Sequence, residues 1–150
     1  MANTFTSLHY HFIFSTKNRE RWIRPDIEER LWAYLGGIAS RHGIKPIVIG
    51  GIEDHVHLLV GMPPTLTVSE ALQSIKGASS GWIKQSLPGC GGFAWQDGYG
   101  AFTVSKSVLN NVENYIRQQR EHHREKSFQE EYRGLLKKHG IAYDERYLWD

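Results

Sequence analysis

The sequence predicts an α/β (α+β) protein built on one antiparallel sheet with helices on one face. Alternating and helical apolar patterns follow one another in the order strand, helix, strand, strand, helix, strand. The length of 150 residues suits a single domain over residues 1–150. Hydrophobic residues at 40% and charged residues at 23% provide a core and exclude a disordered or coiled-coil chain. This order of elements is the split β-α-β pattern of ferredoxin-like folds.

The N-terminal part is predicted to form a strand and then a helix. Residues 8–15 are rich in aromatic side chains that alternate with a period of two, which is typical of a strand. Pro25 suits the first position of a helix and is followed by acidic residues in the first turn. Apolar residues then recur at helical spacing, and we expect this helix to end near Gly43.

The middle of the chain is predicted to form a hairpin and a second helix. Residues 44–51 are rich in β-branched side chains, and residues 55–60 again suit a strand, so the two runs look like a hairpin. Thr67 or Ser69 can cap a helix that extends to about Gln85.

The last strand is predicted from a turn signal. Residues 93–96 and 99–105 flank Asp97-Gly98, a strong signal for a two-residue hairpin turn. In the predicted fold the first and third strands are central neighbours, helices cover one face of the sheet, and the other face stays open. Function is expected on that open face.

The C-terminal part is predicted to be helical. Ser107 can cap a third helix that runs to about His123, and residues 128–139 repeat helical spacing. We therefore expect extra C-terminal helices, with an extension that begins at about residue 124.

Composition limits the cellular setting. The single cysteine, Cys90, excludes a disulfide framework and a cysteine-rich zinc site. The sequence contains no run of 18 or more apolar residues, and its N-terminus does not resemble a signal peptide. These features predict a cytoplasmic protein without membrane contact.

Basic residues exceed acidic ones by only 18 to 16, but they cluster locally. One cluster contains Lys17, Arg19 and Arg21, and a second lies around Arg120. Either cluster could contact a phosphate backbone, and either could equally be a solvated charged surface.

The most informative stretch contains two histidines separated by one residue. On a strand, His55 and His57 share one face about 7 Å apart along the backbone, close enough to hold one cation together. A bare pair of this kind is also compatible with ordinary polar residues on a half-exposed strand. A metal site needs at least a third ligand.

The predicted third helix offers both a ligand and a nucleophile. Tyr115 and Gln119 are four residues apart and would lie one turn from each other on a single helical face. A tyrosine hydroxyl becomes a useful nucleophile when a metal polarises a phosphodiester beside it. The Gln119 oxygen would complete a set suited to Mg²⁺ or Mn²⁺. Taken alone, Tyr115 would fit a core position with its hydroxyl at the rim.

Together these residues resemble the HUH single-tyrosine transposases, the insertion-sequence-200-like transposases and their relatives associated with repetitive extragenic palindromes. His55-Val56-His57 matches the histidine, hydrophobic, histidine signature, and Tyr115 with Gln119 matches the tyrosine motif. The similarity extends over nearly the whole chain and includes His9-Tyr10-His11-Phe12, Ser15-Thr16-Lys17, Lys76-Gly77 and Ser79-Ser80.

The resemblance implies that His55, His57 and Gln119 bind a divalent metal, Mg²⁺ or Mn²⁺, at the scissile phosphate of single-stranded DNA. Tyr115 would attack that phosphate, leaving a free 3′-hydroxyl and a 5′-phosphotyrosine that a second 3′-hydroxyl can displace. It further implies a homodimer that recognises hairpin-forming element ends. A domesticated relative that processes chromosomal palindromes is the nearest alternative.

Other residues are weaker candidates. His9 and His11, on the first strand, could orient a metal ligand or contact phosphate. Candidate DNA contacts are Lys17, Arg19, Arg21, Lys76, Ser79 and Arg120. His122 and His123 could extend the metal site, but Gln119 has the better phase relative to Tyr115, so the plainer expectation is that both histidines face DNA or solvent.

Two functions from other classes compete with the transposase interpretation. A non-catalytic nucleic-acid-binding module could share the fold, although such modules present aromatic residues where this chain presents histidines. Histidine-motif nucleotide hydrolases place a further histidine where this chain has Leu59.

Overall fold

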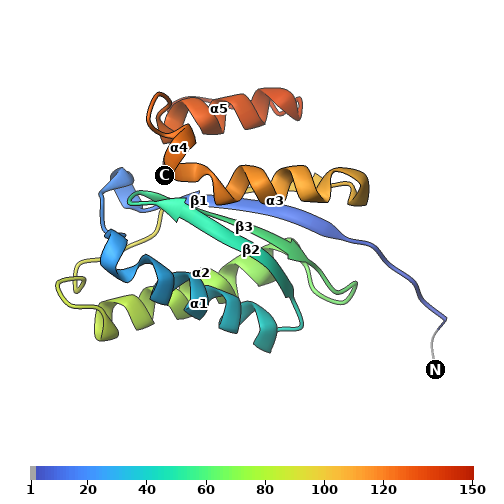
Figure 1. Ribbon diagram of the computed structural model, residues 1–150, viewed down its shortest axis with the longest axis horizontal. Coiled ribbons are helices and arrows are strands. Elements are labelled where there is room, and N and C mark those ends of the chain that lie inside the picture. The colour runs from blue at the N-terminus through green and yellow to red at the C-terminus, as the bar shows by residue number, and fades with distance from the viewer. Residues whose placement is uncertain (1–2) are drawn as a thin grey trace.

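The structure is a computed structural model that describes residues 3–150, and it has helices on both faces of a four-stranded antiparallel sheet (Figure 1). The strands are β1 (His9–Ser15), β2 (Lys45–Ile52), β3 (His55–Gly61) and β4 (Gly100–Val104). Their order in the sheet is β2-β3-β1-β4. The predicted α+β fold is confirmed, with the first and third strands in the centre.

Two helices, α1 (Pro25–Arg41) and α2 (Val68–Ser86), cover one face of the sheet. The period of two along β3 directs Val56, Leu58 and Val60 toward these helices, where all three are fully buried. Thr67 caps α2, since its side chain accepts a hydrogen bond from the backbone N–H of Glu70. This layer contains the main hydrophobic core.

The C-terminal helices lie on the opposite face of the sheet (Figure 1). They are α3 (Leu109–Arg117), α4 (Gln119–His122) and α5 (Phe128–Lys138); short 3₁₀ turns, η1 (Lys17–Arg19) and η2 (Lys106–Val108), follow β1 and β4. The expectation of an open second face is therefore corrected. The helices cover this face because it carries apolar side chains. Ile13 and Leu59 point to it and are fully buried beneath the helices.

The predicted third helix is interrupted at Gln118, whose φ of −103° and ψ of 24° end α3 before α4 begins. The helix also lies unusually close to the sheet. A Cβ atom at Gly50 in β2 would lie only 2.9 Å from the backbone oxygen of Ile116 in α3. The absence of a side chain at Gly50 therefore allows α3 to pack this close to the sheet.

The hairpin predicted around Asp97-Gly98 does not form. Gly100 begins β4, which pairs with β1, and Trp95 makes only an isolated bridge to Thr16. The turn is held instead by the ammonium group of Lys76, which donates to the carbonyl oxygens of residues 96, 97 and 98 at 2.7, 3.0 and 2.7 Å. Hydrogen bonds from a lysine thus replace the expected cross-strand pairing.

Among the helices of residues 3–150, none combines the length and the apolar character needed to cross a membrane.

Candidate active site

Strand β3 places His55 and His57 beneath the C-terminal helices. The two residues share the face opposite Val56 and Leu58, as the alternation predicts. Their ring centroids are 5.0 Å apart, and both side chains are fully buried rather than half-exposed. Buried imidazoles need partners, because an unsatisfied polar group in the interior is costly.

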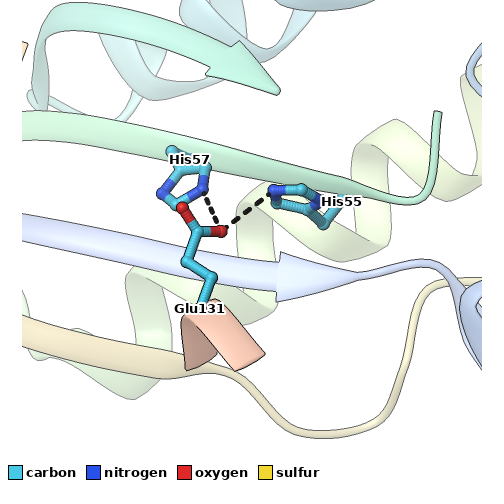
Figure 2. A group of neighbouring side chains, drawn as sticks. All are labelled: His55, His57 and Glu131. Carbon is cyan, nitrogen blue, oxygen red and sulfur yellow. Dashed lines mark hydrogen bonds and ion pairs between the residues drawn. The ribbon is translucent and has the colours of Figure 1, made fainter. Parts of the chain in front are cut away.

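Those partners come from α4 and α5. His55 Nε2 lies 2.9 Å from Gln119 Oε1 and 3.2 Å from Glu131 Oε1, and His57 Nε2 lies 3.1 Å from the same Glu131 oxygen. Figure 2 shows the Glu131 carboxylate reaching from its helix to the two imidazoles. Ligand atoms of His55, His57 and Glu131 all lie within 4.8 Å of one another. The spacing is compatible with a shared metal ion.

Tyr115 reaches the same cluster from α3. Its hydroxyl donates a hydrogen bond to Glu131 Oε2, which also accepts one from Gln119 Nε2 at 3.0 Å. The Tyr115 ring is 5.9 Å from the His57 ring, centroid to centroid. One chain therefore brings together the tyrosine, the two histidines and the glutamine that the sequence singles out.

A second set of contacts fixes the imidazole rings from behind. His55 Nδ1 donates to Asp54 Oδ1 at 2.7 Å, and His57 Nδ1 forms a hydrogen bond of 2.7 Å with His11 Nε2. Both rings are thereby oriented with Nε2 toward Glu131. The contact between His55 and the Asp54 carboxylate is typical of histidines that ligate metals.

The electrostatics of the cluster centre on the Glu131 carboxylate. Burial alone would raise its pKa, but His57, His123 and His55 outweigh that effect and hold the pKa of Glu131 far below its usual range. Burial lowers the pKa of His57, whereas Asp54 and Glu131 overcome burial at His55 and raise its pKa to about 9. The buried Glu131 carboxylate thus lies among imidazoles, and its negative charge favours a positive charge beside it.

The environment of Tyr115 keeps its phenol protonated. Burial is the main cause of the raised pKa of Tyr115, and the nearby negative charge of Glu131 raises it further. The hydroxyl consequently acts as a donor in this arrangement.

Sequence reasoning missed Glu131. This residue lies on the buried stripe of α5, in phase with Phe128, Tyr132 and Leu136. A carboxylate on an apolar stripe is a detectable signal, since a buried charge requires a partner.

His123 also belongs to the cluster, so its preferred placement toward DNA or solvent is wrong, and the alternative that it extends the site agrees with the structure. Its side chain is only 3% exposed, and its Nε2 lies 3.0 Å from Gln119 Oε1 and 3.1 Å from Glu131 Oε1. The available signal was its position one turn after Gln119.

Of the weaker candidates, His11 contacts the cluster through His57, and the others lie outside it. His9 pairs with Gly61 at the far end of β1, whereas His11 pairs with Leu59 beside the site. Lys76 is engaged by the 96–98 turn, and Ser79 is buried with its hydroxyl accepting from Trp95 Nε1. These observations do not test a role in DNA binding.

The basic candidates lie toward the surface. Lys17 and Arg21 are exposed, and the Arg19 guanidinium lies 5.4 Å from the centroid of a Trp149 ring. Arg120 bridges Glu28 and Glu53 at 2.9 and 2.8 Å. Their contacts with DNA stay predictions.

Comparisons with known proteins show that the chain is similar to transposases. Residues 4–119 match the model of the family described as "Transposase IS200 like". The ISDra2 transposase TnpA of Deinococcus radiodurans is 29% identical over 117 residues, covering 75% of this chain and 84% of that protein. The IS200 transposase of Salmonella typhimurium is 25% identical over 127 residues, covering 81% of this chain and 82% of that protein.

Two solved structures share the fold. A structure described as a transposase from Deinococcus radiodurans R1 superposes with a TM-score of 0.66 at 27% identity, covering 79% of this chain and 95% of the other. A REP-associated tyrosine transposase bound to a REP hairpin gives a TM-score of 0.59 at 13% identity, covering 82% and 73% of the two chains.

Proposed function

The chain belongs to the IS200-like transposase family, and we propose that it cuts and rejoins single-stranded DNA through a covalent bond to Tyr115. One observation carries the proposal. The Tyr115 hydroxyl, the two Nε2 atoms of His55 and His57, and the side chain of Gln119 all converge on one carboxylate, that of Glu131. A nucleophile beside a cluster of metal-ligand atoms is an arrangement suited to metal-assisted phosphodiester cleavage.

The donor atoms fit a divalent cation. His55 and His57 supply imidazole nitrogens, and Gln119 supplies a carboxamide oxygen, a set that suits Mn²⁺ or Mg²⁺. Glu131 offers a further oxygen that the sequence analysis did not anticipate. When bound, the ion would polarise the scissile phosphate as a Lewis acid.

The chain's own residues account for the exchange of bonds. The Tyr115 oxygen attacks phosphorus, the bond from phosphorus to the 3′-oxygen breaks, and a 5′-phosphotyrosine forms. Glu131 Oε2 accepts the Tyr115 hydrogen bond and orients the hydroxyl, the phenol proton passes to solvent, and the departing 3′-oxygen takes a proton from solvent. A second DNA 3′-hydroxyl then attacks the phosphotyrosine and reverses the exchange. One ester replaces another at each step, so ATP is not needed.

The DNA partner we propose is a hairpin-forming element end. The REP-associated relative with the same fold is bound to a REP hairpin, and this supports the choice of probe. A domesticated relative acting on chromosomal palindromes would use the same residues. We also propose a homodimer in the cytoplasm. Because Gln119 contacts His55 and Tyr115 contacts Glu131 within one chain, such a dimer would not need to exchange helices between its subunits.

The test is covalent capture. The protein is incubated with a labelled pool of single-stranded DNA hairpins and Mn²⁺, and the products are separated on a denaturing gel. We expect a metal-dependent protein–DNA adduct that disappears in Tyr115→Phe and in His57→Ala. Tyr147→Phe is the matched control, since Tyr147 is 67% exposed. An adduct that persists in Tyr115→Phe, or no adduct from any hairpin, would refute the proposal.

A further inference from the structure

A cleft of about 640 Å³ opens beside Tyr115, between α3, α5 and β4. His11, Tyr115 and Glu131 line the cleft where it meets the candidate active site. Cavities of about 300–1,000 Å³ are the size that holds small organic ligands. The cleft therefore has room for a group attached to whatever Tyr115 attacks.

The walls of the cleft are largely apolar and partly aromatic. Phe102 and Val104 of β4 form one wall, Val112 of α3 a second, and Leu135 of α5 a third. The Phe102 ring stacks on the His139 ring with centroids 4.5 Å apart and an angle of 25° between the planes. Phe102 is buried in this stack, and the exposed His139 ring next to aliphatic side chains suits a planar, weakly polar ligand such as a nucleobase.

Basic side chains lie at the margin of the same cleft. Lys126 and Lys138 both line it and are exposed. The carboxylate within the cleft, that of Glu131, is engaged by the buried histidines. A positive rim around an apolar interior matches a nucleotide, whose phosphates would lie at the rim and whose base would enter.

We propose that this cleft binds the base of a nucleotide next to the scissile phosphate of single-stranded DNA, an inference that rests on the proposed function. The cleft is continuous with Tyr115, so a nucleotide joined to the attacked phosphate is within reach. Its α5 wall lies beyond residue 119, where the match to the family ends. The C-terminal segment of this chain therefore contributes to DNA selection.

Gly134 offers a way to fill the cleft without disturbing the fold. It lines the cleft on α5, and a Cβ atom at this position would meet nothing within 4 Å. Gly134→Leu adds a side chain to that wall, and leucine also favours a helix more than glycine does. Gly81→Leu is the matched control: Gly81 is an exposed glycine of α2, on the opposite face of the sheet, with equally open space around it.

The experiment measures DNA binding, independently of cleavage. A fluorescent pool of single-stranded hairpins with randomised flanks is titrated with the full chain, and the best-bound member is isolated. We expect Gly134→Leu to weaken its binding about tenfold, the order of one lost base-stacking contact, and Gly81→Leu to bind as the unmodified protein does. Equal binding by Gly134→Leu, or no binding of the pool, overturns the proposal.

An abasic scan then tests whether a base is the occupant. Each flank base is removed in turn. At one position, removal of the base should weaken binding to the unmodified protein but should not weaken the already reduced binding to Gly134→Leu. The proposal is overturned if, at every position, removal of the base weakens binding to Gly134→Leu by the same factor as binding to the unmodified protein. The adduct gel separates the two hypotheses. An adduct without this binding pattern overturns only the proposal that the cleft binds a base. The binding pattern without an adduct overturns only the proposal that Tyr115 cuts DNA.

Discussion

Replacing Gly50 by alanine tests whether the contact between α3 and the sheet positions the active site. The added Cβ would lie 2.9 Å from the Ile116 oxygen and 3.2 Å from Ile116 Cγ2, both closer than an ordinary contact, so α3 must move away from β2. Overpacking of this kind costs about 1–3 kcal/mol. Removing a glycine returns about 0.5–1 kcal/mol through the entropy of the unfolded chain.

The expected net loss for Gly50→Ala is about 0.5–2 kcal/mol in the free energy of unfolding. For a chain of this size that lowers Tm by about 1–8 °C. The loss of adduct formation should be larger than the loss of stability suggests, because Tyr115 directly precedes Ile116 in α3 and moves with it. Small displacements of reacting groups cost about 100-fold in rate.

The assay combines thermal unfolding by circular dichroism with the rate of adduct formation at 20 °C below Tm. Gly37→Ala in α1 is the control, since a Cβ there meets nothing within 4 Å and should slightly stabilise the helix. A Gly50→Ala protein that unfolds like the unmodified protein and forms the adduct at the same rate would refute the reasoning.

Three further predictions concern the carboxylates and α5. Asp54→Asn should weaken Mn²⁺ binding about 10–100-fold, because His55 Nδ1 loses its carboxylate partner; isothermal titration calorimetry measures this, and unchanged affinity contradicts it. Glu131→Gln should also weaken Mn²⁺ binding in the same titration while leaving the fold intact by circular dichroism, whereas tighter binding would show that the carboxylate only obstructs the site. Leu136→Ala should cost about 2–5 kcal/mol in urea unfolding, because the side chain is 5% exposed in the cluster beneath α5, and a cost near zero would mean that α5 is not packed as described.

Local sequence patterns predicted the elements that anchor the site. The period of two along β3 correctly separated the core residues Val56 and Leu58 from His55 and His57, because strand geometry alternates side chains between faces. The helical spacing of residues 128–139 likewise predicted α5.

What the sequence did not reveal depends on contacts between distant segments. The break at Gln118 has no proline or glycine to mark it, and the Asp97-Gly98 hairpin signal was overridden by Lys76 from α2. Glu131 could be assigned only once α5 was placed on the sheet, since nothing in its own helix says which buried group it meets. Burial of the histidines followed from the same packing.

The strand that carries the two histidines is packed more extensively than the helices that carry the other residues of the site. His55 and His57 lie in a central strand that is hydrogen-bonded on both sides, above the main core. Tyr115, Gln119 and Glu131 come from short helices that pack through two small clusters. Local opening is governed by such differences, so backbone amides of β3 should exchange with deuterium far more slowly than those of α3 to α5. Under the proposed function, Tyr115 would carry its DNA strand on the segment that opens more readily, while His55 and His57 would keep their positions for the next strand.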